Sequence, residues 1–199
     1  MKKIFHEGFV LFIALCLYGS PVFSQVWEKY DSTFFQLSLW NPVQIVPEDI
    51  DVLGLRLNLI YGENRDSYGL DLGLVNSLTR DMLGAQAGLL NVSRGEMRGI
   101  QIGLDNIVGN IDAFGLEHPS FSRGAPCAYG LQFGAFNLIY PKGVMMGAQV
   151  GIINVADKIQ GLQVGIVNCA KDMTGIQIGL INYNDSAEFY LSPVVNACF

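Results

Sequence analysis

A short repeat of about 15 residues is the feature that most constrains this chain. Each unit begins Gly-apolar-Gln-apolar-Gly-apolar-apolar-Asn, as in GLQVGIVN at 161–168 and GIQIGLIN at 175–182. The first glycines of successive units are 14 to 17 residues apart when a degenerate unit at Gly115 is included. Regular self-similarity predicts an architecture in which every unit adds the same small piece of structure. The eight well-formed units open at Gly54, Gly69, Gly84, Gly99, Gly130, Gly147, Gly161 and Gly175.

Within each unit, side-chain character alternates with a period of two. The first, third and fifth residues after the opening glycine are apolar in all eight units, for example Leu162, Val164 and Ile166. The residues between them are polar or small. This alternation is typical of a β-strand whose two faces meet different environments, and each glycine would destabilise a helix by about 1 kcal/mol. The sequence therefore predicts an all-β fold of short strands.

Two amide residues mark fixed places in the repeat, and we interpret both as structural. Glutamine fills the second position of six units, at Gln86, Gln101, Gln132, Gln149, Gln163 and Gln177. Asparagine fills the seventh position of seven units, at Asn76, Asn91, Asn106, Asn137, Asn154, Asn168 and Asn182. Because Asn caps turns and tolerates left-handed backbone, we expect it to end each strand. A row of ligand-binding asparagines is the alternative.

The two ends of the chain suggest export. Residues 1–24 combine a basic start, a short apolar run and a small-residue cleavage site, which predicts a secretory signal peptide. Residues 25–199 then form one β-repeat domain, interrupted by an irregular loop at 109–128. The formal net charge is −6 and no basic cluster is present in the sequence, so we expect no nucleic-acid partner.

Two architectures fit the alternation. The first is an antiparallel β-barrel or meander of about 10–12 short strands in the outer membrane, the size range of small bacterial barrels. Its partners would be outer-membrane lipid and the barrel-assembly machinery, which would recognise the closing strand that ends at Phe199. Leu162 and Val164 would then face lipid, and Gln163 would face the lumen. Such a protein would be a structural or surface-exposed component, or a minor pore.

The alternative is a secreted or periplasmic β-solenoid that acts as a binding module. Asn168 and Asn182 would then stack as a ladder, and the apolar face would form a dry core. The sequence does not identify a surface ligand for either architecture.

The chain offers little support for an enzyme. The only histidine after the leader is His118, which lies near Ser120 without a Gly-x-Ser-x-Gly motif. Glu48, Asp49 and Asp51 form an acidic cluster, but they lack the glycine and distal glutamate of a calcium-binding loop. We therefore expect no catalytic site, no metal and no cofactor. The spacing of Cys127, Cys169 and Cys198 fits no zinc or redox motif, and the sequence selects no disulfide pair among them.

The repeat G-[LIV]-Q-[LIV]-G-[LIV]-[LIV]-N resembles that of a bacterial surface-repeat family best known from spirochaetes. The segment FQLSLWNPVQIVPEDIDVLGLRLNLIYG resembles the start of those proteins, and LSPVVNACF resembles their end, so the resemblance covers nearly all of residues 34–199. Residues 109–128 depart from the family's pattern. The resemblance implies a surface or outer-membrane location. The family offers no reaction and no catalytic residues to transfer to this chain.

Overall fold

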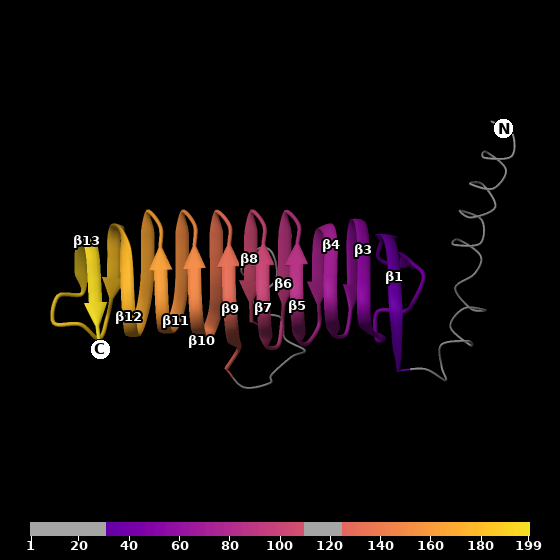
Figure 1. Ribbon diagram of the computed structural model, residues 1–199, viewed down its shortest axis with the longest axis horizontal. Coiled ribbons are helices and arrows are strands. Elements are labelled where there is room, and N and C mark those ends of the chain that lie inside the picture. The colour runs from indigo at the N-terminus through magenta and orange to yellow at the C-terminus, as the bar shows by residue number, and fades with distance from the viewer. Residues whose placement is uncertain (1–30, 110–124) are drawn as a thin grey trace, which may run out of the picture.

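The computed structural model describes residues 31–109 and 125–199, and within these ranges all regular structure is β-strand. The predicted all-β class is confirmed. The strands follow one another along an elongated body, from β1 at one end to β13 at the other (Figure 1). Their bounds are β1 Ser32–Trp40, β2 Val43–Gln44, β3 Asp51–Asn64, β4 Ser67–Leu78, β5 Met82–Ala87, β6 Leu90–Ser93, β7 Met97–Ile102, β8 Asp105–Val108, β9 Cys127–Phe133, β10 Phe136–Val150, β11 Ile153–Val164, β12 Val167–Asn184 and β13 Leu191–Cys198.

The chain is a β-solenoid, so the predicted antiparallel barrel is wrong and the architecture of the alternative, a β-solenoid, is confirmed. Successive repeats pair in parallel and in register: Gly147 pairs with Gly161, and Gly161 with Gly175. Each repeat therefore forms one coil stacked on the preceding coil. Sheet order also contradicts a closed barrel, because β13 and β2 lie at opposite ends of the strand order.

Each coil is flattened and has two strand segments. On one side β5, β7 and β9 stack in parallel, and on the other side β6 stacks on β8. In later coils one continuous strand turns from one side to the other. β10, for example, pairs with β8 through Phe136–Ile139 and with β9 through Val144–Val150. The longest repeat absorbs its additional residues between these two parts, where the register shifts.

The interior contains the Gln and Asn residues, and the repeat's apolar face lies outside. Gln163 and Asn168 are fully buried, whereas Ile166 is exposed. The dry core that the solenoid alternative predicted from the apolar face is therefore wrong. Amides can be buried here because parallel, in-register stacking places each one beside its copy in the next coil. A smaller apolar core complements them, in which Met97, Met145 and Ile159 are fully buried.

Two rows of glycine make this narrow interior possible. The opening glycines have positive φ angles, such as 145° at Gly161, a backbone conformation that L side chains rarely adopt. A Cβ atom at Gly161 would lie 2.0 Å from the carbonyl oxygen of Gly147. The second row packs against the asparagines: a Cβ at Gly165 would lie 2.6 Å from Asn154 Nδ2. The second glycine of the repeat is thus a packing position, where a larger side chain would collide with an asparagine of the interior.

At its two ends the solenoid departs from the parallel stacking of its middle coils. β1 pairs in parallel with β3, while the short β2 turns back antiparallel to β1. At the other end β13 runs antiparallel to β12. Phe199 follows β13 and is 93% exposed. Its role as an assembly signal stays a prediction.

Some sequence predictions fall in other places or outside the described residues. The asparagines do not end strands: Asn91 and Asn106 lie within β6 and β8, the second segments of their coils. Their prediction as turn residues is wrong because the corner comes two to three residues earlier, at the second glycine and the residue after it. The signal peptide at 1–24 lies outside the described residues, as does most of the irregular loop at 109–128.

Candidate functional site

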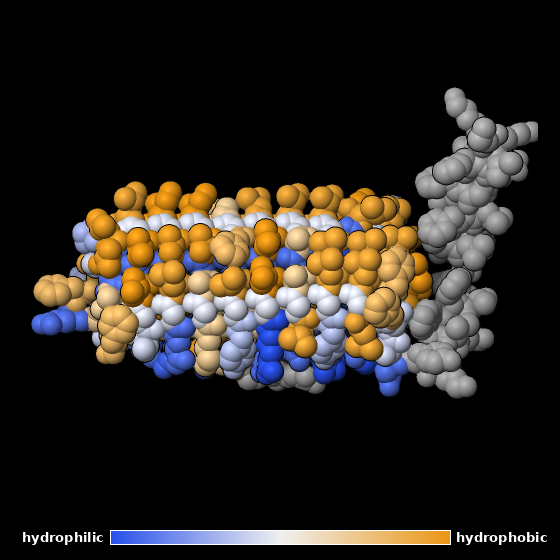
Figure 2. Space-filling view, in the orientation of Figure 1, coloured by the Kyte–Doolittle hydropathy of each residue, from blue (hydrophilic) through white to orange (hydrophobic). Residues whose placement is uncertain are grey.

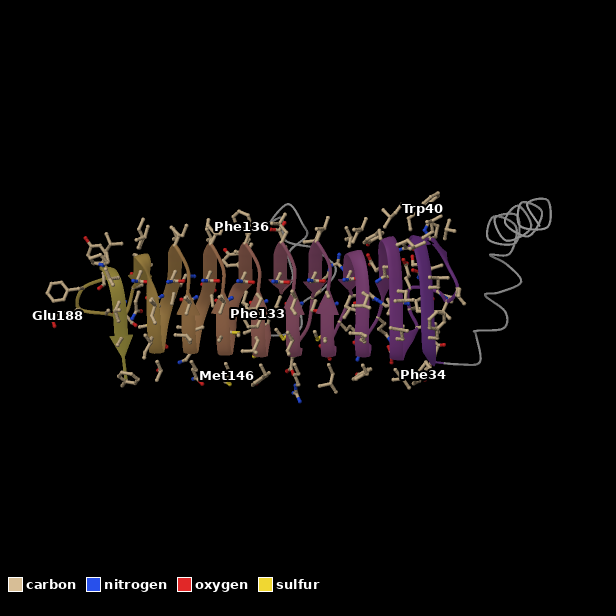
Figure 3. All side chains as sticks on the ribbon, turned by 45° about the horizontal axis from the view of Figure 1, so that its top comes forward. Phe34, Trp40, Phe133, Phe136, Met146 and Glu188 are labelled. Atoms are coloured by element: carbon tan, nitrogen blue, oxygen red, sulfur yellow. The ribbon has the colours of Figure 1, made fainter. Side chains whose placement is uncertain are left out.

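The glutamines form a continuous hydrogen-bonded ladder along the interior. From Gln101 onward, each Gln donates from Nε2 to the Oε1 atom of the Gln in the preceding coil, as Gln163 does to Gln149 at 2.8 Å. All six predicted Gln residues belong to this row. Figure 3 shows nitrogen and oxygen atoms repeating from coil to coil inside the ribbon.

The asparagines form a second ladder that runs in the opposite direction. Each Asn donates from Nδ2 to Oδ1 of the Asn in the following coil, as Asn154 does to Asn168 and Asn168 to Asn182, both at 2.8 Å. The stacking predicted for a solenoid is therefore confirmed. The other Nδ2 hydrogen is used as well, because Asn154 also donates to the carbonyl oxygen of Val164. The remaining links join Asn58, Asn76, Asn91, Asn106, Asn137 and Asn154.

These ladders stabilise the fold but do not provide an accessible site. All seven predicted Asn residues and all six Gln residues are buried. Unpaired buried amides would destabilise the fold, and the ladders pair them without water. A ligand approaching from solvent would find no exposed amide, so the structure gives no support to a ligand-binding row of asparagines.

An ion pair starts the glutamine ladder, at a place the sequence analysis did not single out. Asp71 replaces Gln in its coil, and its Oδ2 accepts a hydrogen bond from Gln86 Nε2 at 2.8 Å. Its Oδ1 accepts from Arg56 Nε at 2.9 Å, and both charged side chains are almost completely buried. Opposite charges at the same repeat position in adjacent units were a sequence signal for this pair. At the other end, Asn196 Nδ2 donates to Gln177 Oε1 at 3.2 Å.

A continuous apolar edge, which we call the crest, is the most conspicuous feature of the outer surface. It comprises the fifth residue of each repeat, at the corner between the two strand segments. Seven of its members are Leu or Ile with exposed fractions between 48% and 69%. Its residues are Leu59, Leu74, Leu89, Leu104, Ala135, Ile152, Ile166 and Leu180. Figure 2 shows apolar residues along this edge, at the top of the view.

Apolar side chains flank the crest on both sides. Figure 3 shows Phe136 pointing outward at this edge. We call the crest and its two flanking rows the crest strip, within which Asp105 is the one charged residue. On one side the row is Leu57, Leu72, Ala87, Ile102, Phe133, Val150, Val164 and Ile178. On the other side it is Tyr61, Val75, Leu90, Asp105, Phe136, Ile153, Val167 and Ile181.

Backbone N–H groups of several crest residues donate hydrogen bonds to the neighbouring coil. The N–H of Leu89 donates to the carbonyl oxygen of Leu74, and the N–H of Leu104 donates to that of Leu89, both at 2.9 Å. The same link joins Ile166 to Ile152. At these positions the crest presents apolar side chains over backbone N–H groups that are already hydrogen-bonded.

Charges gather at the opposite edge, where one coil passes to the next. Lys158 pairs with Asp172 at 2.8 Å, and Lys171 pairs with Asp157 at 2.6 Å. We call this row of turns the charged edge; it lies along the bottom of Figure 2. Burial raises the pKa of the Asp66 carboxyl here, and the backbone N–H of Asp81 only partly offsets that effect.

The other candidates give no assembled site. No group of three or more metal-ligating side chains that could hold an ion occurs within residues 31–109 and 125–199. Cys127, Cys169 and Cys198 are free thiols, and burial raises the pKa of Cys169. A small pocket beside the charged edge is lined by Asp81, Glu96 and Arg98, but Arg98 already pairs with Glu96 at 2.7 Å. His118 lies outside the described residues.

No helix in the described part of the chain is long and apolar enough to cross a membrane. Comparisons of the chain with family models, with curated proteins and with solved structures found no match.

Proposed function

We propose that this protein is an exported, non-catalytic β-solenoid that binds an apolar partner surface through its crest strip. The observation that carries the proposal is the distribution of charge on the outer surface: the crest strip is apolar apart from Asp105, and charged side chains gather at the opposite edge. An interior role cannot explain this pattern, because the repeat places its amides inside and its Leu and Ile residues outside.

Physical chemistry favours a binding role for such a surface. Soluble monomers rarely expose a contiguous apolar patch larger than a few hundred Å², and larger patches mark sites of interaction. Isolated exposed apolar residues are common, but here the same corner position is apolar in every coil. Association would remove these side chains from water, which would favour the complex by about 25 cal/mol per Å² of apolar area buried.

Export supports the same proposal from the sequence. The predicted leader would place the solenoid in the envelope or outside the cell, where a rigid rod with a uniform apolar edge can attach to another component. The resemblance to bacterial surface-repeat proteins agrees with this location. No residue of the crest strip is assigned a catalytic role.

Retention on an apolar matrix tests the proposal without knowledge of the partner. The exported protein should bind a phenyl resin at moderate salt, and the triple variant Leu89→Ser, Leu104→Ser, Ile166→Ser should elute much earlier. The matched control, Leu53→Ser, Leu83→Ser, Met146→Ser, removes three exposed apolar side chains near the charged edge and should stay retained. Equal retention of the two variants, with both folded by circular dichroism, would refute a binding role for the crest.

A further inference from the structure

We infer that the partner of the crest strip is the surface of a lipid bilayer, into which the crest inserts from one side without crossing it. This inference rests on the proposed function and identifies its partner. It also differs from a barrel embedded in the membrane, because here only one edge of the solenoid would meet lipid.

The shape of the crest favours a fluid partner over a second copy of the chain. The crest is convex, being the corner of a flattened coil. Seven steps between its eight coils span roughly 34 Å, and the two sheets are about 10 Å apart, so the footprint of the crest alone, without its flanking rows, is only about 340 Å² per copy. A standard protein interface needs about 800 Å² per partner with good shape complementarity. A lipid leaflet conforms to a convex edge and requires no complementary surface.

The distribution of polar groups also suits insertion. The backbone N–H groups of Leu89, Leu104 and Ile166 are already bonded to neighbouring coils, so insertion of the crest would not leave these donors unpaired in lipid. The flanking rows begin one or two residues from the crest, within about 7 Å along the strands. That depth matches the 5–10 Å to which interfacial elements enter the boundary between headgroups and acyl chains.

The charged edge would remain in water during insertion. One strand segment separates it from the crest, and a segment of six or seven residues is about 20 Å long. The lysines at this edge are paired with carboxylates, as in Lys158–Asp172. Since the formal net charge is −6, the protein has no electrostatic attraction for anionic headgroups. Binding should therefore depend on apolar area alone, and phosphatidylcholine should suffice.

Liposome flotation tests the inference with defined lipids. The exported protein should float with phosphatidylcholine vesicles, and neither 20% phosphatidylglycerol nor a change in salt should strengthen binding. The crest triple variant, Leu89→Ser, Leu104→Ser, Ile166→Ser, should lower the partition coefficient at least about tenfold, because it removes three Leu or Ile side chains that would be buried in the bilayer. The control triple variant Leu53→Ser, Leu83→Ser, Met146→Ser should float like the wild type; Figure 3 places Met146 at the edge opposite the crest.

The outcomes separate the inference from the proposed function. If the protein stays with the aqueous fraction yet binds phenyl resin through the crest, the lipid inference is overturned and the binding role remains. Light scattering then asks whether the crest joins two copies, which would show as a dimer that the crest variant converts to a monomer. If both triple variants float equally, the crest is not the lipid contact and the inference fails. Loss of both resin retention and flotation in the wild type would overturn the proposed function as well.

Discussion

Single glycines set the spacing of the coils. Gly175 has a φ angle of 144°, and a Cβ there would lie 1.9 Å from the carbonyl oxygen of Gly161. The obstacle is backbone, which cannot rotate away as a side chain can. The opening glycine is thus required for two reasons: its positive φ angle and its close contact with the backbone of the preceding coil.

Gly175→Ala should lower the free energy of unfolding by at least about 3 kcal/mol, because backbone strain adds to the steric clash. Chemical denaturation measures this change. Thr174→Ala is the control, since Thr174 is the exposed neighbour in the same strand and should change stability by less than about 0.5 kcal/mol. Comparable losses for both variants would mean that the coils are not stacked this closely.

A substitution at Gln149 tests whether the amide ladder excludes water, as its direct hydrogen bonds indicate. Gln149 donates to Gln132 and accepts from Gln163, both at 2.8 Å. In Gln149→Glu a protonated carboxyl can make both bonds, but an ionised carboxylate would lose the donor and be buried without a cation. The folded-state pKa of the new carboxyl should therefore be raised. Stability should be close to that of the wild type in acid and fall by about 3 kcal/mol or more as pH rises through that pKa. Gln160→Glu, at an exposed position, should show no such fall.

Asp105 gives a natural pH dependence within the crest strip. Burial raises the pKa of its carboxyl above the ordinary value, so the folded protein holds this proton more tightly than the unfolded chain. The group therefore lowers stability progressively as pH rises from the ordinary pKa through the raised one. Asp105→Asn should be isostable with the wild type in acid and more stable at neutral pH. Urea unfolding across that pH range measures the difference, and a constant difference at all pH values would contradict the assignment.

At the scale of the element, the buried ion pair closes the first end of the glutamine ladder. Arg56 also donates from Nη1 to the carbonyl oxygen of Ser77 at 3.0 Å, so both partners are held by several bonds. The carboxylate of Asp71 only accepts hydrogen bonds, so the row can end there without leaving an unpaired donor. A charged pair here thus fixes the direction of the whole ladder.

Arg56→Leu should lower the free energy of unfolding by about 3–5 kcal/mol, because it leaves the carboxylate of Asp71 buried without its cation. Adding Asp71→Gln should recover at least half of that loss, since the ladder would continue by one more amide onto Gln86. Thermal or urea unfolding of the single and double variants measures the coupling. A double variant no more stable than Arg56→Leu would show that the charge of Asp71 is not the source of the loss.

The strands could be predicted from the sequence, but their pairing could not. Alternation around Leu162, Gln163 and Val164 is the same whether the neighbouring strand is parallel or antiparallel. The informative signal was the in-register repetition itself: Gln163 meets Gln177 only if successive units run in parallel with equal spacing. The barrel interpretation nevertheless placed the Gln residues inside and the apolar residues outside, which is their arrangement in the solenoid.

At the scale of the whole molecule, the last strand gives the rod an edge that disfavours the addition of another strand. β13 reverses direction on β12, and its Pro193 has no N–H to offer another strand. Val194 next to it has a φ angle of 69°, so this part of the edge departs from regular strand geometry. These features were partly visible as a proline near the end of the chain. Their capping role became clear only when the strand order was known.

The length and straightness of the rod could not be read from composition, because they arise from stacking between coils. A solenoid adds one strand spacing per repeat, whereas a closed barrel brings its first and last strands together. Variation in repeat length does not separate these architectures, since the solenoid absorbs it at a corner, as between Ile139 and Val144. Distances between equivalent residues do separate them.

The most direct measurement is the distance between pairs of spin labels along the crest, in a background with Cys127, Cys169 and Cys198 replaced by serine. Leu74 and Ile152 are four coils apart and Leu74 and Leu180 are six, which predicts Cα separations of about 19 and 29 Å. The solenoid therefore predicts that the second pair is about 10 Å farther apart than the first. A second distance equal to or shorter than the first would contradict the stacked architecture and the crest that depends on it.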